Sequence, residues 1–326
     1  MSQSMVVNVH EVGGPEKLVI ESQQVGDPGP GQVKIQTTHV GLNFIDVYFR
    51  TGLYPQPASP FVPGCEAAGN VIAVGDNVDG LTVGDRVAYV IPGGAYAEQR
   101  LVDAEKLVKL PDGISNETAA AIMLKGMTVR YLFKRSFPLQ AGQRALFHAA
   151  AGGVGLIACQ WAKALGAELV GTAGSADKCQ RAIDMGASAC LNYRDADWVE
   201  QAQALTGGSG FAVAYDSVGK ATFEPSLDCL SKFGTLVSFG NASGPVTDVN
   251  LGVLAAKGSL YVQRPTLFAY IADRAGLEES AQDLFDVVLS GDVKPIIGGT
   301  MPMAQIADAH KALEARETTG SIVLTF

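Results

Sequence analysis

The sequence predicts an α/β protein of two domains, a small β-rich barrel and a doubly wound parallel sheet. Three observations predict this fold class. Short strands separated by Pro/Gly turns fill residues 1–125, a strand, a glycine turn and a helix follow over residues 145–165, and strands then alternate with helices. At 326 residues the chain is long enough to build two cores.

Composition narrows the class of protein. The chain has 24 basic and 33 acidic side chains, and the net charge of −9 disfavours nucleic-acid backbones as partners. The five cysteines are scattered without a C-x-x-C pair, which is typical of a reducing compartment. No secretion signal and no apolar run of about 18 residues is present, so we expect a cytoplasmic protein that does not interact with membranes.

The first domain is predicted from its short apolar runs. Pro- and Gly-rich turns, such as the one at residues 27–31, separate them and favour a barrel over a helical domain. The expected strands cover residues 5–9, 18–20, 33–37 and 71–74, with a further strand opening at residue 84.

A glycine turn between a strand and a helix forms the centre of the second domain. An apolar run at residues 145–148 leads into the turn with the spacing A-x-x-G-x-x-G, at Ala149, Gly152 and Gly155. Apolar residues then recur with helical periodicity, Gly166 lies where a helix C-cap needs positive φ, and residues 168–172 resemble the next strand. This unit predicts a dinucleotide site, although such turns also serve merely to pack a helix against a sheet.

The residues after the second strand predict which dinucleotide binds. An acidic residue that would bind a ribose 2′-hydroxyl is missing from residues 172–175. Ser175 and Lys178 instead suit a 2′-phosphate, so we interpret the cofactor as NADP(H). The alternative is that Lys178 is an ordinary solvated residue.

The rest of the chain continues the alternation and then returns to the first domain. Because six strands complete the parallel sheet, we expect the tail to rejoin the barrel. Helices are expected at residues 176–185, 197–205, 222–230, 278–289 and 304–315, and strands at 189–193, 212–215, 235–239, 260–263, 296–297 and 321–326.

Polar side chains recur at helical spacing after the third expected strand. Asn43, Asp46 and Arg50 stand at i, i+3 and i+7, which places an amide, a carboxylate and a guanidinium along one side of a helix. Tyr48 and Tyr54 offer ring faces and hydroxyls for a planar ligand. The alternative is that Asp46 and Arg50 form a structural ion pair and that the tyrosines pack.

The arrangement resembles the medium-chain dehydrogenase/reductase superfamily, with its GroES-like barrel and its Rossmann domain. In zinc members, G-H-E-x-x-G and an upstream cysteine supply zinc ligands. Here Cys65 replaces that histidine and Asn43 replaces that cysteine. A catalytic zinc needs about three protein ligands, so we predict none. We expect Cys65 to be a small buried residue rather than a nucleophile.

Within the superfamily the chain most resembles the zinc-independent NADPH:quinone oxidoreductases, the zeta-crystallin-like group, and especially its bacterial members. The resemblance spans nearly the whole chain and implies domains at residues 1–125 with 267–326 and at residues 126–266. The motifs that carry it are N-F-I-D-x-Y-x-R-x-G-x-Y from Asn43, L-K-G-M-T from Leu124, F-H-A-A-A-G-G-V-G from Phe147, Y-D-S-V-G from Tyr215, S-F-G-N-A-S-G from Ser238 and Y-V-Q-R-P-T-L from Tyr261.

The resemblance implies roles residue by residue. The implied quinone pocket consists of Asn43, Tyr48, Tyr54 and Arg264. The implied cofactor-binding residues are Asn43, Asp46, Tyr131, Gly152, Gly153, Val154, Gly174, Ser175, Lys178, Tyr193, Ser217, Phe239, Gly240, Asn241, Pro265, Leu267 and Arg316. Simpler interpretations stay open for Tyr193, as a strand end, and for Arg316, as a cation near the C-terminus of the last helix.

The implied activity is metal-free reduction of quinones by NADPH in a cleft between the domains. The nearest alternative is an NADPH-dependent reductase of enone or alkenal C=C bonds. A different alternative is a non-catalytic NADPH-binding or RNA-binding protein, which the charge of −9 disfavours. Residues 260–263 are an apolar sheet edge that favours a homodimer.

Overall fold

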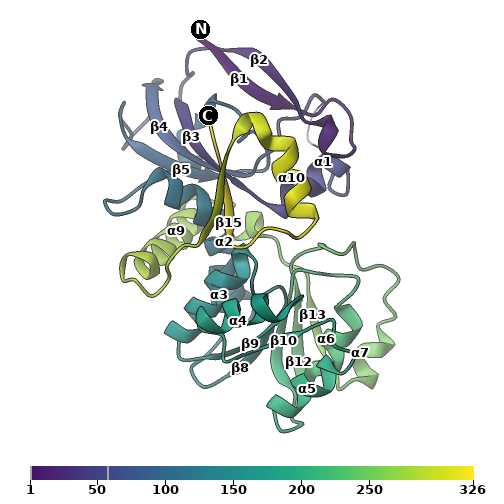
Figure 1. The fold of residues 1–326 in the computed structure, drawn as a ribbon. Helices are drawn as coiled ribbons and strands as arrows, with labels where there is room; N and C mark the ends of the chain where they lie inside the picture. Colours follow the sequence, from purple (N-terminus) through teal and green to yellow (C-terminus); the bar gives the residue numbers. More distant parts are fainter. Residues whose placement is uncertain (1, 57–58) are drawn as a thin grey trace. The chain divides into compact units, whose positions relative to one another are not determined.

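The computed structural model describes residues 2–56 and 59–326, and the chain divides into two compact units. The first unit comprises Met1–Met127, Tyr270–Leu289 and Pro295–Phe326, and the second comprises Thr128–Ala269 and Ser290–Lys294. The chain passes from the first unit to the second after Met127, two residues beyond the expected boundary, and back again after Ala269, three residues beyond it. Residues 290–294 also belong to the second unit. Both marked ends of the ribbon belong to the first unit (Figure 1).

The first unit is built on an antiparallel sheet with one parallel edge. Its strand order is β14-β15-β3-β4-β5-β7, β6 also pairs with β3, and β1 and β2 form a separate hairpin. The strands are β1 (Ser2–Asn8), β2 (Val19–Val25), β3 (Gln32–Leu42), β4 (Glu66–Val74), β5 (Arg86–Val90), β6 (Gln99–Asp103), β7 (Val108–Lys109), β14 (Ile297–Pro302) and β15 (Ser321–Thr325). The tail therefore rejoins the barrel, because β15 pairs with β3 in the register Ile322 to Leu42.

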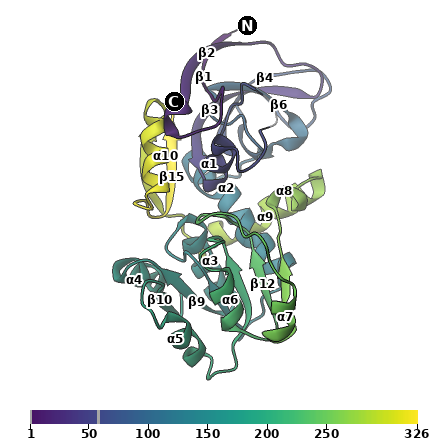
Figure 2. The same ribbon diagram turned by 90° about the vertical axis from the view of Figure 1, so that its right-hand side faces the viewer.

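Helices close the first unit around an aliphatic core. The core gathers Val33, Ile35 and Val40 of β3 with Val87 of β5 and Ile322 of β15. Helix α10 lies beside α1 and β15 in Figures 1 and 2. The helical segments are η1 (Pro15–Lys17), α1 (Phe44–Thr51), η2 (Ala104–Lys106), α2 (Asn116–Tyr131), which continues into the second unit, α9 (Arg274–Leu289), η4 (Met303–Gln305) and α10 (Ile306–Glu314).

The second unit contains the predicted six-stranded parallel sheet. Its order is β10-β9-β8-β11-β12-β13, with helices on both faces (Figures 1 and 2). The strands are β8 (Arg144–Phe147), β9 (Glu168–Ala173), β10 (Ala189–Asn192), β11 (Phe211–Asp216), β12 (Leu230–Ser238) and β13 (Tyr261–Gln263). The helical segments are η3 (Leu132–Ser136), α3 (Gly153–Ala164), α4 (Ala176–Asp184), α5 (Trp198–Leu205), α6 (Phe223–Cys229), α7 (Gly252–Ala256) and α8 (Leu267–Tyr270).

This strand order reverses direction between β8 and β11. The chain first adds β9 and β10 on one side of β8, and then adds β11, β12 and β13 on the other. Dinucleotides bind at such a switch point, outside the carboxyl ends of the strands. No helix within the described residues is long and apolar enough to span a membrane.

Candidate active site

Cofactor residues predicted from the sequence follow the carboxyl ends of the six parallel strands. Gly152 follows β8, Ser175 follows β9, Tyr193 follows β10, Ser217 follows β11 and Asn241 follows β12. Because parallel strands all end at one edge of a sheet, five separate stretches of sequence meet there. Arg264 comes directly after β13 at the same edge.

The glycine turn after β8 fits a pyrophosphate. Helix α3 begins at Gly153, and the first turn of a helix leaves amide N–H groups without intrahelical acceptors. A Cβ at Gly155 would lie 2.4 Å from the carbonyl oxygen of Ala149, so glycine lets the helix pack against the end of the strand. Ala149 itself has φ of 56°, a left-handed conformation that glycine adopts more easily. Gly166 has φ of 74° after α3, as the sequence predicts.

The four residues predicted to hold the 2′-phosphate end are brought together. Ser175 is the N-cap of α4, and its Oγ accepts a hydrogen bond from the Lys178 amide at 3.3 Å. A Cβ at Gly174 would lie 2.5 Å from the Tyr193 hydroxyl, so glycine allows the tyrosine to approach the turn. The Ser175 side chain thus caps the N-terminus of α4, Lys178 lies in its first turn, and the Tyr193 hydroxyl lies beside the preceding glycine; an anion is favoured at such a helix end.

A buried carboxylate holds the turn that contains Ser217. Asp216 is fully buried, and its Oδ1 accepts hydrogen bonds from the amides of Val218 at 2.7 Å and Gly219 at 3.1 Å. Thr222 donates its hydroxyl to the same oxygen at 2.8 Å. Asp216 is part of the Y-D-S-V-G motif, and no role was predicted for it from the sequence. A carboxylate at the end of an apolar strand was the signal that could have identified it.

The ends of β12 and β13 are connected through Arg264. Its Nη1 donates to the carbonyl oxygen of Ser238 at 2.8 Å. In the amide orientation that satisfies both groups, the side-chain oxygen of Asn241 accepts from Arg264 Nη2 at 2.9 Å. Gly240 lies against Ser217, since a Cβ there would meet the Ser217 carbonyl at 2.4 Å. The predicted residues Phe239 and Pro265 are half-buried neighbours, and Leu267 is buried in α8.

Arg316 lies just beyond the end of the last helix. Helix α10 ends at Glu314, and Arg316 follows it with φ of 59°. The backbone N–H of Arg316 donates to the carbonyl oxygen of Leu313, and the backbone N–H of Glu317 donates to the carbonyl oxygen of Ala312. This is the hydrogen-bond pattern of a Schellman motif. Glycine usually occupies this left-handed position, so the arginine is there at a conformational cost. Tyr131, at the end of α2, is 2% exposed.

In the first unit, Asn43 is fixed at the start of α1. Its backbone N–H donates to Asp46 Oδ2 at 2.9 Å, and its side-chain Nδ2 donates to Glu66 at 2.7 Å. Asp46 is wholly buried and also accepts from the Tyr96 hydroxyl at 3.1 Å, and burial raises its pKa to about 7. The buried Asp46 carboxyl therefore holds the backbone of Asn43 in place. The rings of Tyr48 and Tyr54 meet edge to face, with centroids 5.2 Å apart.

Arg50 pairs with a different residue from the one considered in the sequence analysis. The guanidinium forms its ion pair with Glu314 at 2.8 Å and not with Asp46, and Nη1 donates to His310 Nδ1 at 3.0 Å. Because arginine can only donate, Nδ1 is the acceptor and the imidazole proton lies on Nε2, 2.9 Å from Tyr96 Oη. Burial lowers the pKa of His310 to about 3, which keeps the ring neutral. Sequence reasoning missed Tyr96, His310 and Glu314.

The positions that resemble zinc ligands do not fit a zinc ion. Glu66 Oε1 accepts hydrogen bonds from Asn43 Nδ2 and from the Lys125 ammonium, each at 2.7 Å. A carboxylate oxygen occupied by an amide and a cation is not available to a metal. Cys65 is fully buried, as expected, and burial raises the pKa of its thiol well above the usual value. Within residues 2–56 and 59–326, no three His, Cys, Asp or Glu side chains form a metal-binding group.

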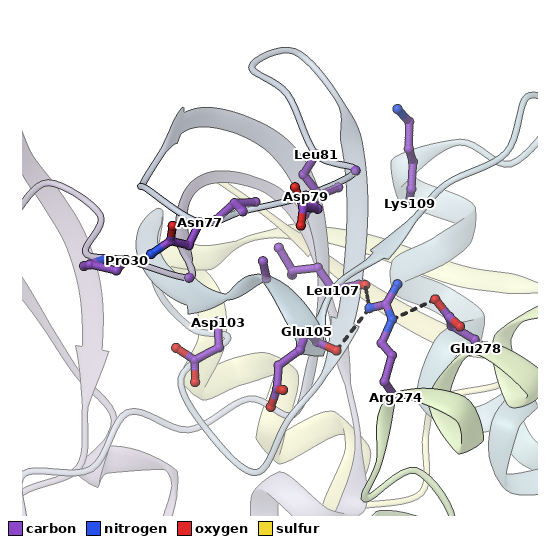
Figure 3. A pocket seen from close by; sticks show the side chains of 14 residues that line it. Pro30, Asn77, Asp79, Leu81, Asp103, Glu105, Leu107, Lys109, Arg274 and Glu278 are labelled. Atoms are coloured by element: carbon purple, nitrogen blue, oxygen red, sulfur yellow. Dashed lines mark hydrogen bonds and ion pairs between the residues drawn. The ribbon is translucent and has the colours of Figure 1, made fainter.

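The barrel unit also has a surface hollow of about 720 Å³ (Figure 3). Its lining mixes charges of both signs, and Arg274 bonds there to Glu278 and to backbone carbonyls of Glu105 and Leu107. None of the predicted site residues lines it. The hollow is therefore separate from the candidate site.

Comparison with known proteins agrees with this geometry. Residues 29–112 match the alcohol dehydrogenase GroES-like domain, and residues 153–279 match the zinc-binding dehydrogenase family. The chain is 51% identical to a quinone oxidoreductase of Pseudomonas aeruginosa, over 96% of each chain. It is 41% identical to a 2-haloacrylate reductase of Burkholderia sp., over 98% of each chain.

Among solved structures, the Escherichia coli quinone oxidoreductase complexed with NADPH has a TM-score of 0.97 and 47% identity to this chain. The match covers 99% of this chain and 100% of that one. Identity at this level over nearly full length, together with both domain matches, decides the family. The chain therefore belongs to the quinone oxidoreductase family of the medium-chain dehydrogenase/reductase superfamily.

Proposed function

We propose that the protein catalyses the reduction of quinones by NADPH without a metal. The observation that carries this proposal is the set of residues at the carboxyl ends of the six strands, on a fold that matches an NADPH complex with a TM-score of 0.97. The balanced reaction is quinone plus NADPH plus a proton, giving hydroquinone plus NADP⁺. When bound, NADPH supplies the two electrons, and the protein orients the reactants.

The second unit offers a place for each part of the cofactor. The amides at the start of α3, Gly153 and Val154, would bind the pyrophosphate. Ser175 and Lys178 would bind the 2′-phosphate, and Tyr193 would cover the adenosine end. The turns at Ser217 and Asn241 would hold the ribose and nicotinamide. Arg316, which the sequence also predicts as a cofactor residue, belongs to the first unit. Preference for NADPH over NADH follows from the 2′-phosphate contacts.

The acceptor side belongs to the first unit. Tyr48 is 8% exposed and Tyr54 is half-buried, so a planar quinone would pack against the exposed edge of this aromatic pair. Asn43 lies at the start of the same helix, fixed by Asp46 and Glu66. Arg264, held by Ser238 and Asn241, is the predicted contribution of the second unit to the acceptor. Without a metal to polarise an isolated carbonyl, an acceptor that is already electrophilic is favoured.

A second candidate is the reduction of activated C=C bonds. The observation that favours it is the 41% identity to a 2-haloacrylate reductase over 98% of the chain. Both acceptor classes take electrons at a carbon conjugated to a carbonyl or carboxylate, so the same donor groups serve them. The larger identity to quinone oxidoreductases supports quinones as the first choice.

We further propose a cytoplasmic homodimer. The edge strand β13 exposes Tyr261 by 62% and Val262 by 41%, which is apolar surface that a second copy could cover. The five cysteines are free thiols, which suits a reducing compartment. A monomeric mass in light scattering at micromolar concentration would contradict the dimer.

The test of function is cofactor oxidation followed by absorbance on chelator-treated protein. 1,4-Benzoquinone and 1,4-naphthoquinone are compared with 2-chloroacrylate and a simple alkenal, each with NADPH and with NADH. We expect quinone-dependent consumption of NADPH and at least tenfold weaker use of NADH. Turnover of the C=C substrates alone would select the second candidate, and NADPH binding without any turnover would contradict both.

A further inference from the structure

Lys125 is a buried cation that uses one of its three N–H donors. The residue is 5% exposed, and its Nζ donates one hydrogen bond, to Glu66 Oε1 at 2.7 Å. It forms no other hydrogen bond with the described part of the chain. A buried ammonium needs partners for all its donors. Two donors of Lys125 are therefore available to a molecule that binds beside it.

Asn43, which is predicted from the sequence to bind the acceptor, has no side-chain N–H group left to donate to a ligand. Both of its side-chain N–H groups are used, one by Glu66 Oε1 at 2.7 Å and one by the Gly41 carbonyl at 3.3 Å. Lys125 and Asn43 share the same carboxylate oxygen, so their nitrogen atoms lie side by side. The donor available next to Asn43 is thus the ammonium.

Glu66 fixes the ammonium at this position. Its side chain is fully buried, and its second oxygen accepts from the Leu124 amide at 2.7 Å, so both oxygens are anchored. The helix that carries Lys125 therefore also orients the carboxylate that binds it. A cation held in advance in a water-poor site stabilises charge more strongly than one that must reorganise.

We propose that Lys125 is a catalytic residue whose ammonium donates a hydrogen bond to the carbonyl oxygen of the quinone. This assignment rests on the proposed function. As the quinone accepts two electrons, its oxygen becomes an oxyanion, and Lys125 stabilises that charge while the protons of the hydroquinone come from NADPH and from solvent. The ammonium thus lies beside Asn43, which stands where the sequence of the zinc members has a cysteine ligand.

The experiment uses the double variant Lys125→Met with Glu66→Gln, which removes both charges and avoids an unpaired buried one. Steady-state kinetics with NADPH are measured for a series of benzoquinones and naphthoquinones of decreasing reduction potential. We expect kcat/KM to fall about 100-fold, as for loss of one preorganised donor. The loss should grow for the weaker electrophiles, and the dissociation constant for NADPH should stay within twofold of the wild type.

Lys311→Met serves as the matched control, because Lys311 is an exposed lysine of the same unit, 64% exposed and paired with Asp308. A double variant that keeps kcat/KM within threefold of the wild type across the whole series would overturn the assignment. A uniform loss that does not depend on the reduction potential of the quinone would also overturn it, since a purely structural role predicts that result.

A second variant keeps the test decisive if the double variant does not fold. Lys125→Arg retains the cation but moves its donors, and we expect at least a tenfold loss of kcat/KM with unchanged NADPH binding. Full activity of this variant on the weak electrophiles would refute the role of the ammonium. Absence of quinone turnover by the wild-type protein would instead remove the proposed function, and this assignment with it.

Discussion

Arg50 binds Glu314 across 264 residues of sequence, with Nη2 to Oε1 at 2.8 Å. The side chain of Arg50 is 1% exposed, and it also donates to His310 and to the Gly13 carbonyl. Helix α1, which begins next to Asn43, is therefore fixed to α10 by one guanidinium. The position of Asn43 and of the tyrosines on this helix, which are predicted to bind the acceptor, depends on this connection.

Replacing Arg50 by methionine should destabilise the protein by about 3 kcal/mol, because a partly buried ion pair, the buried ring nitrogen of His310 and the half-buried Gly13 carbonyl lose their donor. In a chain of this size the melting temperature should fall by about 4–5 °C. Lys311→Met removes an exposed pair and should change stability by less than about 0.5 kcal/mol. Thermal unfolding of both variants checks the prediction, and equal melting temperatures would contradict it.

Asp46 should make stability depend on pH in an unusual direction. Burial raises the pKa of its carboxyl to about 7, above the unfolded value, so folding takes up a proton between about pH 4 and 7. The stability that this proton contributes is complete below about pH 4 and is lost as the pH rises to 7. Over some three pKa units this amounts to about 4 kcal/mol.

The measurement compares Asp46→Asn with the wild type by urea unfolding at pH 4.5, 6 and 7.5. The wild type should lose stability relative to the variant as the pH rises. Asp85→Asn is the control that should show no trend over this range, because Lys109 lowers the pKa of Asp85 and its contribution to stability is lost only as the pH falls below about 4. A difference between the wild type and Asp46→Asn that does not change with pH would mean that Asp46 is ionised throughout.

Lys178 should determine the choice between the two nicotinamide cofactors. Removing a charged hydrogen bond to the 2′-phosphate costs about 1.5–3 kcal/mol, so Lys178→Ala should raise the KM for NADPH at least tenfold. The KM for NADH should stay within twofold, because NADH has no 2′-phosphate. Lys220→Ala removes an exposed lysine of the same unit and should leave both values unchanged. Parallel losses for both cofactors would refute the assignment.

Arg316 should show a trade between stability and activity. Its left-handed backbone costs about 1 kcal/mol that glycine avoids, so Arg316→Gly should raise the melting temperature by a few degrees. The same change should lower kcat/KM for NADPH, because the cation is lost. Arg316→Ala separates the two effects, since it removes the cation and keeps the strained position. A glycine variant with full activity would show that the arginine is not needed.

Local sequence patterns predicted the second unit well. The glycine turn, the helical periodicity after it and the positive φ of Gly166 depend on neighbours within about 20 residues. The alternation of strands with helices then predicted the parallel, doubly wound sheet, and the structure supplies the order of its strands. Helix α2 was not delimited, because it is buried on nearly all sides, with polar residues such as Lys125 and Arg130 among the buried ones, and so shows no amphipathic periodicity.

Contacts between distant segments could not be predicted in this way. Lys125 was quoted within a motif without a role, because its partner Glu66 lies 59 residues away. Arg50 stands four residues after Asp46, which suggested a local ion pair, but its partner Glu314 comes from α10. Spacing along a helix shows which side chains share a face, and it does not show which other element covers that face.

The pairing of β15 with β3 has a consequence for biosynthesis. β3 needs residues 321–325 as its neighbour, and Ile322 lies opposite Leu42, the residue before Asn43. On the ribosome, residues 128–269 emerge and can fold while that edge of β3 is still uncovered. The parallel sheet of the second unit can therefore form before the strand that precedes Asn43, a predicted acceptor residue, has its neighbour. Until translation reaches β15, the unpaired edge of β3 is exposed to chaperones and to other nascent chains.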